Sequence, residues 1–191
     1  MEVREEITVT RDEALALVKK HIKNKNLVKH TLAVEAVMRR LAEHFGEDVD
    51  KWGLAGLLHD IDYSETQDDP SRHSLVGGEM LAEMGVEEDI VQAVKAHNEY
   101  HGLPRETKMA KALYASDPLT GLIVAAALIH PDKKLGSIDV DFVMNRYGEK
   151  SFARGANREI IASCTELGLD LREFVGLGLE AMQDIASDLG L

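Results

Sequence analysis

Four histidines and two aspartates are the side chains of this chain whose types and spacing could do chemistry together. Each lies on, or directly beside, the apolar stripe of a segment with helical periodicity, where an ionisable residue is uncommon. Burying a carboxylate costs several kcal/mol, on the order of the desolvation penalty of a charge, unless a cation compensates for it. If the segments pack on one core, the six groups converge, and a bound cation then explains their placement. They are His30, His59, Asp60, His73, His97 and Asp117.

These six side chains form a set of nitrogen and oxygen donors without a thiolate. Such a set suits Fe, Mn, Co, Ni or Zn better than Ca or Mg, which prefer shells made of oxygen alone. His59 and Asp60 are adjacent and cannot both follow one helical stripe, but from the end of a helix they can reach two sides of one site. Asp60 could then bridge two metals. We therefore expect one or two divalent transition-metal ions as cofactors.

Helical periodicity also supplies the elements that would position these groups. Apolar residues make up 45% of the 191 residues and aromatic residues only 5%, which favours helices over strands. Thr10 and Glu13 form a capping box that predicts the start of the first helix, and Gly46 is a stop signal for the second. The helices are predicted at about 10–22, 26–45, 52–59, 71–84, 87–100, 105–129, 140–147, 158–167 and 171–189.

A polar segment and a proline interrupt this pattern. The segment 64–70 is typical of a loop, and Pro118 predicts a kink or a restart of its helix. The length of the chain fits one domain. We expect an all-α fold, a helical bundle with its core at about 26–130 and a C-terminal helical extension at about 137–191.

The charge balance limits the partners of this protein. There are 22 basic and 34 acidic residues, so the net charge is −12. Non-specific binding to nucleic acid or to an anionic membrane is therefore disfavoured, and neither is expected as a partner. A small phosphate can still bind if a local basic pocket or a metal offsets this field. A homo-oligomer is compatible with the sequence.

The sequence also favours a cytoplasmic location. Cys164 is the single cysteine, which excludes an intrachain disulfide, fits a reducing compartment and suits a core-filling role. The first ten residues are charged and lack the apolar stretch of a signal peptide. The longest apolar run, 122–129, is too short to span a bilayer.

The order of the six residues along the chain resembles the HD superfamily of metal-dependent phosphohydrolases. The resemblance covers roughly residues 26–120 and implies an all-helical fold. It places His30, His59, Asp60 and Asp117 at the four defining metal positions of the superfamily. His73 and His97 match the two further histidines of members that hold a second metal, in the HDIG-type subgroup.

One departure from the subgroup concerns its motif His-Asp-Ile-Gly-Lys. Here the corresponding residues are His59-Asp60-Ile61-Asp62-Tyr63. The lysine of dinuclear diesterases, like the glutamate of some mononuclear nucleotidases, lies near the reacting phosphate. Tyr63 can donate a hydrogen bond but carries no charge. The departure leaves the metal positions in place and leaves open what takes the role of general acid or phosphate clamp.

The resemblance implies metal-assisted hydrolysis of a small phosphoester, and a nucleotide or a related phosphate is the expected substrate. Asp60 or Asp62 could orient the attacking water, although Asp62 could equally be a solvated loop residue. Phosphate suits guanidinium groups and helix N-termini. Each basic candidate for substrate binding is also explained by a solvated surface position. The candidates are Arg72, Arg105, Lys108, Lys150, Arg154 and Arg158.

Two other functions are compatible with the same ligands. The set resembles that of the di-iron oxygenases of this superfamily, which activate O2 instead of water. A nucleotide sensor that kept the pocket and lost turnover is the third possibility, and the absence of the lysine at Tyr63 favours it.

Overall fold

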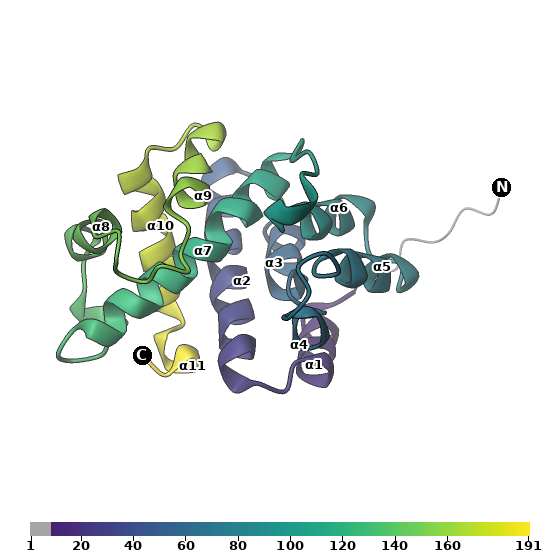
Figure 1. Cartoon of the computed structure of the whole chain (residues 1–191), viewed down its shortest axis with the longest axis horizontal. Coiled ribbons are helices and arrows are strands. Elements are labelled where there is room, and N and C mark those ends of the chain that lie inside the picture. The colour runs from purple at the N-terminus through teal and green to yellow at the C-terminus, as the bar shows by residue number, and fades with distance from the viewer. Residues whose placement is uncertain (1–8) are drawn as a thin grey trace.

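The computed structural model describes residues 9–191, and every regular element in that range is a helix (Figure 1). The expectation of an all-α fold is confirmed. Residues 1–8, on which most of the argument about a signal peptide rests, lie outside the described residues. The elements are α1 (Arg11–His21), α2 (Lys25–Phe45), α3 (Val49–Leu58), α4 (Tyr63–Thr66), α5 (Leu75–Glu83), α6 (Glu88–Ala96), η1 (Glu99–His101), α7 (Lys108–Ile129), η2 (Leu135–Ser137), α8 (Val140–Gly148), α9 (Arg158–Ala162), η3 (Ser163–Leu167), α10 (Leu171–Asp184) and α11 (Ala186–Leu189).

Local capping chemistry sets several helix ends as the sequence predicts. The Thr10 hydroxyl accepts from the Glu13 amide, and the Glu13 carboxylate accepts from the Thr10 amide in return. Gly46 ends α2 with φ +68°, a left-handed conformation that glycine adopts without a steric penalty.

Several predicted helix boundaries differ from the structure. Two of these differences, near the predicted metal ligands, have a local cause. A short helix, α4, forms inside the segment predicted as a polar loop, where the Thr66 hydroxyl donates to the carbonyl oxygen of Asp62. The next helix begins at Leu75 and not at Ser71, because Ser74 has φ +72° and interrupts helical geometry. Both differences fall in or directly after the segment that joins Asp60 to His73.

Pro118 does not interrupt its helix. α7 runs without a break from Lys108 to Ile129, although proline supplies no amide hydrogen to the helical ladder. Buried residues on both sides of the proline, among them Leu113 and Leu122, hold α7 against α2 and α6. Tertiary packing therefore outweighs the helix-breaking tendency of proline here.

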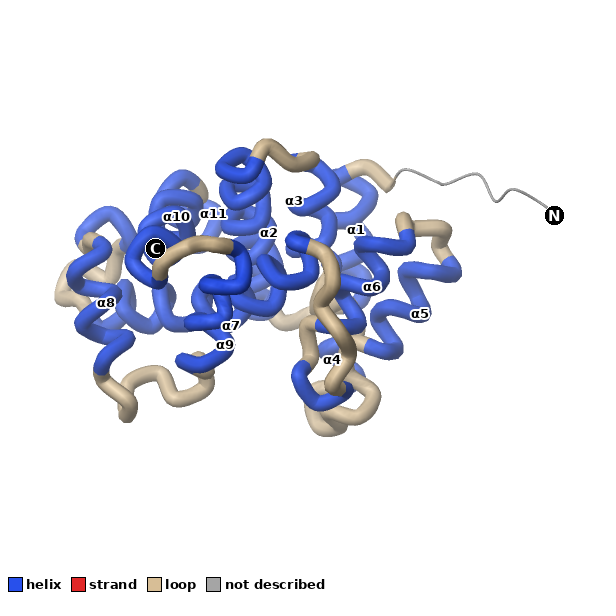
Figure 2. The backbone as a smooth tube through the Cα atoms, turned by 90° about the horizontal axis from the view of Figure 1, so that it is seen from above, coloured by secondary structure: helices blue, strands red, loops and turns tan. Residues whose placement is uncertain are grey.

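Helices α2 and α7 lie at the centre and cross each other (Figure 1). Helices α1 and α3–α6 lie on one side of α2, and α8–α11 lie on the other (Figures 1 and 2). α2 and α3 approach closely because Gly56 has no side chain: a Cβ there would lie 2.9 Å from the Glu35 backbone. This close contact fixes the end of α3, where His59 follows.

The C-terminal helices pack on the same two central helices. A Cβ at Gly178 in α10 would lie 2.7 Å from the Leu119 side chain in α7, so a larger residue there would have to displace that side chain. Arg40 in α2 donates to Glu180 at 3.0 Å and to Asp184 at 2.6 Å. The segment after α7 therefore contacts the part of the chain that carries the candidate metal ligands.

α7 is longer and more apolar than the run at 122–129 suggested. Among the described residues, α7 is the helix that has the length and composition to cross a membrane. Of its most apolar stretch, 56% is buried inside the fold. The core helix of a folded domain has the same length and composition, so these features are weak support for a membrane span.

Candidate metal centre

The structure brings all six predicted ligands together, two from within helices, two from helix C-caps and two from connections. His30 lies in α2 and Asp117 in α7. His59 follows the last residue of α3, and His97 follows the last residue of α6. The remaining two residues, Asp60 and His73, belong to the connections after α3 and before α5. We call these six residues the metal cluster.

Asp60 lies at the middle of the metal cluster, with a different pair of histidines beside each of its oxygens. Its Oδ2 lies 3.3 Å from Nε2 of His59 and 3.5 Å from Nε2 of His30. Its Oδ1 lies 3.4 Å from Nε2 of both His73 and His97. The two oxygens thus face two adjoining groups of ligands.

We name the two groups by the elements that carry them. The core position comprises His30, His59 and Asp117, whose Oδ1 lies 3.0 Å from Nε2 of His30 and 3.7 Å from Nε2 of His59. The loop position comprises His73 and His97. Asp60 belongs to both positions, and its donor atoms lie close enough to each histidine pair to share one ion with it.

Every histidine of the metal cluster is held at Nδ1, which leaves Nε2 directed at the cluster. His59 Nδ1 lies 2.7 Å from the Gly56 carbonyl oxygen, and His97 Nδ1 lies 2.6 Å from the Val94 carbonyl oxygen. Because a carbonyl oxygen can only accept, the Nδ1 atom of each histidine donates. His30 Nδ1 lies 3.3 Å from the Thr120 hydroxyl. Such partners fix the tautomer that a metal-ligating imidazole needs.

The environment of the free nitrogens fits a metal ion. Nε2 of His59 and Nε2 of His97 are buried and have no hydrogen-bond partner among the described residues. A buried polar atom without a partner is costly, and a cation bound between these nitrogens and the carboxylates would remove that cost. Four imidazole nitrogens and two carboxylates without a thiolate form a set that divalent transition metals prefer.

Charges inside the metal cluster shift the pKa values of its members strongly. Burial disfavours the protonated form of His59, but the carboxylates of Asp60 and Asp117 outweigh burial and hold its pKa well above the usual value. Burial likewise opposes ionisation of the two aspartates, yet the neighbouring histidines hold the pKa of each well below its usual range. Both carboxylates are therefore ionised at neutral pH, as metal ligands must be.

Asp62 lies behind the metal cluster, in contact with the far side of His73. Its Oδ1 lies 2.9 Å from Nδ1 of His73, and its Oδ2 accepts from the amides of Ser74 and Gly77, both at 2.8 Å. The side chain is 0% exposed. The hypothesis that Asp62 orients the attacking water does not fit this position, because both oxygens already have partners; nor is Asp62 a solvated loop residue.

Tyr63 lies against the loop position. Its ring meets the His73 ring edge-on, with 5.1 Å between the centroids. Burial raises the pKa of Tyr63, and the nearby carboxylates of Asp60 and Asp117 raise it further. The phenol therefore stays protonated at neutral pH and keeps its ability to donate a hydrogen bond.

Most of the predicted phosphate-binding cations have other partners. Arg72 lies 3.6 Å from Glu65, the Arg105 guanidinium stacks over the Tyr114 ring at 3.7 Å, and Lys108 lies 3.4 Å from Glu47. The prediction that Arg158 binds substrate directly does not fit its position, because its guanidinium is enclosed by main-chain carbonyl oxygens. Lys150 and Arg154 are exposed on the segment before α9.

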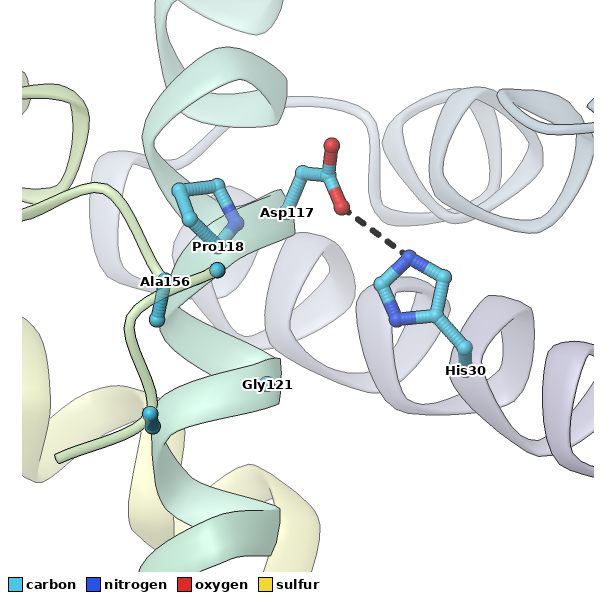
Figure 3. A pocket seen from close by; sticks show the side chains of 7 residues that line it. His30, Asp117, Pro118, Gly121 and Ala156 are labelled. Atoms are coloured by element: carbon cyan, nitrogen blue, oxygen red, sulfur yellow. Dashed lines mark ion pairs between the residues drawn. The ribbon is translucent and has the colours of Figure 1, made fainter. Parts of the chain in front are cut away.

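A cavity of about 370 Å³ opens beside the core position. His30 and Asp117 form one wall, and Pro118 and Gly121 of α7 form another (Figure 3). The segment before α9 completes it with three small residues, Ala153, Gly155 and Ala156. A substrate in this cavity would therefore touch both the metal cluster and the C-terminal extension.

Sequence reasoning missed the residues that hold the ligands in place. The Thr120 hydroxyl donates to the Asp117 carbonyl oxygen and lies next to His30. Asn98 and His101 both donate to the His73 carbonyl oxygen, at 3.0 Å and 2.8 Å. The position of Thr120, three residues after Asp117, could have indicated in the sequence that its hydroxyl lies beside this ligand. The contacts of Asn98 and His101 with His73 arise only from tertiary structure.

The fold and the metal cluster together define an all-helical protein with a centre of histidines and aspartates suited to divalent metal ions. The HD domain model matches residues 27–128, just over half of the chain, and this range contains the whole cluster. The chain belongs to the HD domain family, and the resemblance seen in the sequence is confirmed. This membership implies a metal-dependent phosphohydrolase, with divalent metal ions as its cofactors.

Several relatives carry the name Ribonuclease Y. That of Lawsonia intracellularis is 35% identical over 103 residues, which are 54% of this chain and 20% of the relative. That of Thermotoga petrophila is 30% identical over 139 residues, which are 71% of this chain and 27% of the relative. The chain thus spans about a fifth to a quarter of the length of these relatives. Their name is at odds with the expectation that nucleic acid is not a partner.

Proposed function

We propose that this chain hydrolyses a small phosphoester, such as a nucleotide, at the metal cluster. The observation that carries the proposal is the position of Asp60, whose two oxygens face separate pairs of histidines at 3.3–3.5 Å. A carboxylate in this position can bridge two cations, and two adjoining cations suit in-line displacement at phosphorus.

Bound divalent ions would lower the pKa of water from 15.7 to about 7 and neutralise charge on phosphate oxygens. The chain's own residues supply geometry and hydrogen bonds. Asp60 stays ionised and can accept a hydrogen bond from the attacking water. Asp117 borders the cavity, so it is the carboxylate that a substrate there meets. Tyr63, protonated at neutral pH, can donate to a phosphate oxygen in place of the subgroup's lysine.

RNA is a second candidate substrate, and the name of the relatives is the observation in its favour. The net charge of −12 opposes long polyanions more than small ones, because each added phosphate meets the same repulsive field. We therefore rank the small phosphoester first. We also retain the cytoplasm as the proposed compartment.

The experiment combines metal analysis with a substrate screen. Protein purified without chelators is analysed for metals and then assayed on nucleoside phosphates, cyclic nucleotides and a short single-stranded RNA. We expect bound transition metal and hydrolysis of a small phosphoester, with both lost in His59→Ala. His44→Ala is the control, because His44 is an exposed histidine outside the metal cluster. Cleavage of the RNA alone would favour the second candidate.

The same experiment separates the two remaining functions. O2 consumption by a mixed-valent iron pair, without phosphoester hydrolysis, would support the oxygenase. Tight binding of a nucleotide, without turnover under any metal, would support the sensor. Absence of transition metal from the purified and the reconstituted protein would contradict both the hydrolase and the oxygenase.

A further inference from the structure

The segment that connects α8 to α9, residues 149–157, is organised around the side chain of Arg158. We call it the 149–157 loop. The Arg158 guanidinium donates to carbonyl oxygens within this loop and at the end of α8, at 2.5–3.3 Å. These acceptors belong to Arg146, Tyr147, Glu149, Phe152, Ala153 and Ala156.

The charge of Arg158 is not neutralised by a carboxylate. Among the residues that the structure describes, its guanidinium makes no ion pair, and its donors are spent on neutral carbonyl groups. A guanidinium remains charged at any ordinary pH. The 149–157 loop therefore encloses a positive charge in a protein whose net charge is −12.

The carbonyl contacts also set the direction of the loop's amides. In a trans peptide the C=O and N–H groups point in opposite directions, and the described chain has no cis peptide bond. Because the carbonyls of Phe152 and Ala153 point at Arg158, the amides of Ala153 and Arg154 point away from it. Neither amide, nor that of Gly155, has an acceptor within the described part of the chain.

The backbone conformation and the cavity complete the arrangement. Ala153 has φ +45°, and successive amides beside a left-handed residue can form a concavity that favours anions. Ala153, Gly155 and Ala156 line the 370 Å³ cavity that His30 and Asp117 also line. Their small side chains leave the loop's backbone accessible from this cavity.

We propose that the 149–157 loop binds the substrate's phosphate group in this cavity through its main-chain amides. The ligand is a phosphate or phosphoester anion, held between the loop and the core position. Arg158 is a positioning residue: it acts through the loop by holding the carbonyls and by its uncompensated charge. The phosphate-clamp role that Tyr63 leaves open would then belong in part to the C-terminal extension. This inference rests on the proposed function for the identity of the substrate.

The test measures binding of inorganic phosphate to the metal-loaded protein by calorimetry. Gly155→Val should place a side chain in the cavity without a clash, because a Cβ at Gly155 meets nothing within 4 Å. We expect at least a fivefold loss of phosphate affinity with unchanged metal content. The matched control is Gly136→Val, since Gly136 is also exposed and also meets nothing within 4 Å, but lies in η2 away from the cavity.

Two further variants separate the main chain from the side chains. Arg158→Lys keeps the charge but has too few donors for six carbonyls, so we expect a loss at least as large as in Gly155→Val. Arg154→Ala removes a guanidinium and keeps the main-chain amide, so we expect a smaller loss of phosphate affinity than in Gly155→Val. A full loss in Arg154→Ala with none in Gly155→Val would overturn the proposal and assign binding to the arginine side chain.

The outcome for the loop is distinguishable from the outcome for the proposed function. Hydrolysis with an unchanged KM and unchanged phosphate affinity in Gly155→Val would overturn the loop proposal and leave the function standing. Conversely, phosphate binding that falls in Gly155→Val and not in Gly136→Val supports the loop even if no phosphoester is hydrolysed.

Discussion

The two halves of the metal cluster are built from different kinds of structure. The core position takes His30 and Asp117 from two long helices, α2 and α7, whose apolar faces form the centre of the core. The loop position takes His73 from a connection that becomes helical only at Leu75. Ligands on packed helices are fixed by the core, whereas ligands on connections need their own supporting contacts.

The supporting contacts differ accordingly. At the core position His30 has a neutral hydroxyl partner, Thr120, at 3.3 Å. At the loop position His73 has a buried carboxylate partner, Asp62, at 2.9 Å, which also accepts from two amides at the start of α5. The comparison indicates that removing a support should weaken the loop position more than the core position.

The largest effect is expected from Asp60→Ala, because Asp60 is common to both halves. We expect both metal positions to lose affinity together and phosphoester hydrolysis to fall by at least about 1,000-fold, since the variant loses water activation and phosphate binding by metals. Metal analysis of the purified protein, with turnover on the best substrate, measures both. Retention of two metals by the variant would show that Asp60 is not shared.

Asp62→Asn should weaken metal binding at the loop position and leave the core position unchanged. The amide keeps the size of the carboxylate but removes its charge, and loss of such a partner costs on the order of 10–100-fold in metal affinity. We expect one equivalent of metal to bind as in the parent protein and the second to bind more weakly, in a calorimetric titration of the metal-free protein. Equal weakening of both equivalents would contradict the assignment of Asp62 to the loop position.

Thr120→Val is the matched change on the core side and should have a smaller effect. Valine has nearly the shape of threonine, so packing is kept while His30 loses its hydroxyl partner. We expect a loss of metal affinity smaller than in Asp62→Asn, confined to the core position. A larger loss of metal affinity than in Asp62→Asn would contradict the inference that the loop position depends more on its support than the core position does.

The pH dependence follows from the raised pKa of His59. A metal must displace the proton that the metal-free protein holds there, so apparent metal affinity should fall as the pH is lowered through this raised pKa, starting above the ordinary value of about 6.5. In the metal-free protein the sign is opposite: the stability gained from protonated His59 is complete below about 6.5 and is lost as the pH rises through the raised pKa. Metal titrations and chemical unfolding at several pH values test the two signs.

The smallest effect concerns the C-terminal extension, at a residue outside the metal cluster. Burial raises the pKa of the Cys164 thiol to about 11, and Asp170 adds to the shift. At pH 8 the thiol is therefore protonated, and we expect almost no reaction with a disulfide reagent in the folded protein and full reaction after denaturation. Rapid labelling of the folded protein would show that this part of the chain opens.

Sequence reasoning located the ligands more reliably than their supports. An ionisable residue on an apolar helical stripe is a signal visible along the chain, as His30 and Asp117 illustrate. The role of Asp62 depends on how the segment up to Ser74 folds back. The φ of +72° at Ser74, which shapes this segment, is not encoded in any periodicity. Arg158 was predicted to bind phosphate directly because a loop that closes on a guanidinium cannot be seen in a linear pattern.

The most direct test is a crystal structure of the metal-loaded protein with anomalous scattering measured at the metal absorption edge. We predict two anomalous peaks on either side of Asp60, one bounded by His30, His59 and Asp117 and the other by His73 and His97. A single peak would leave a mononuclear centre and remove the bridging role of Asp60. Peaks elsewhere, with the metal cluster empty at saturating metal, would contradict the existence of this centre.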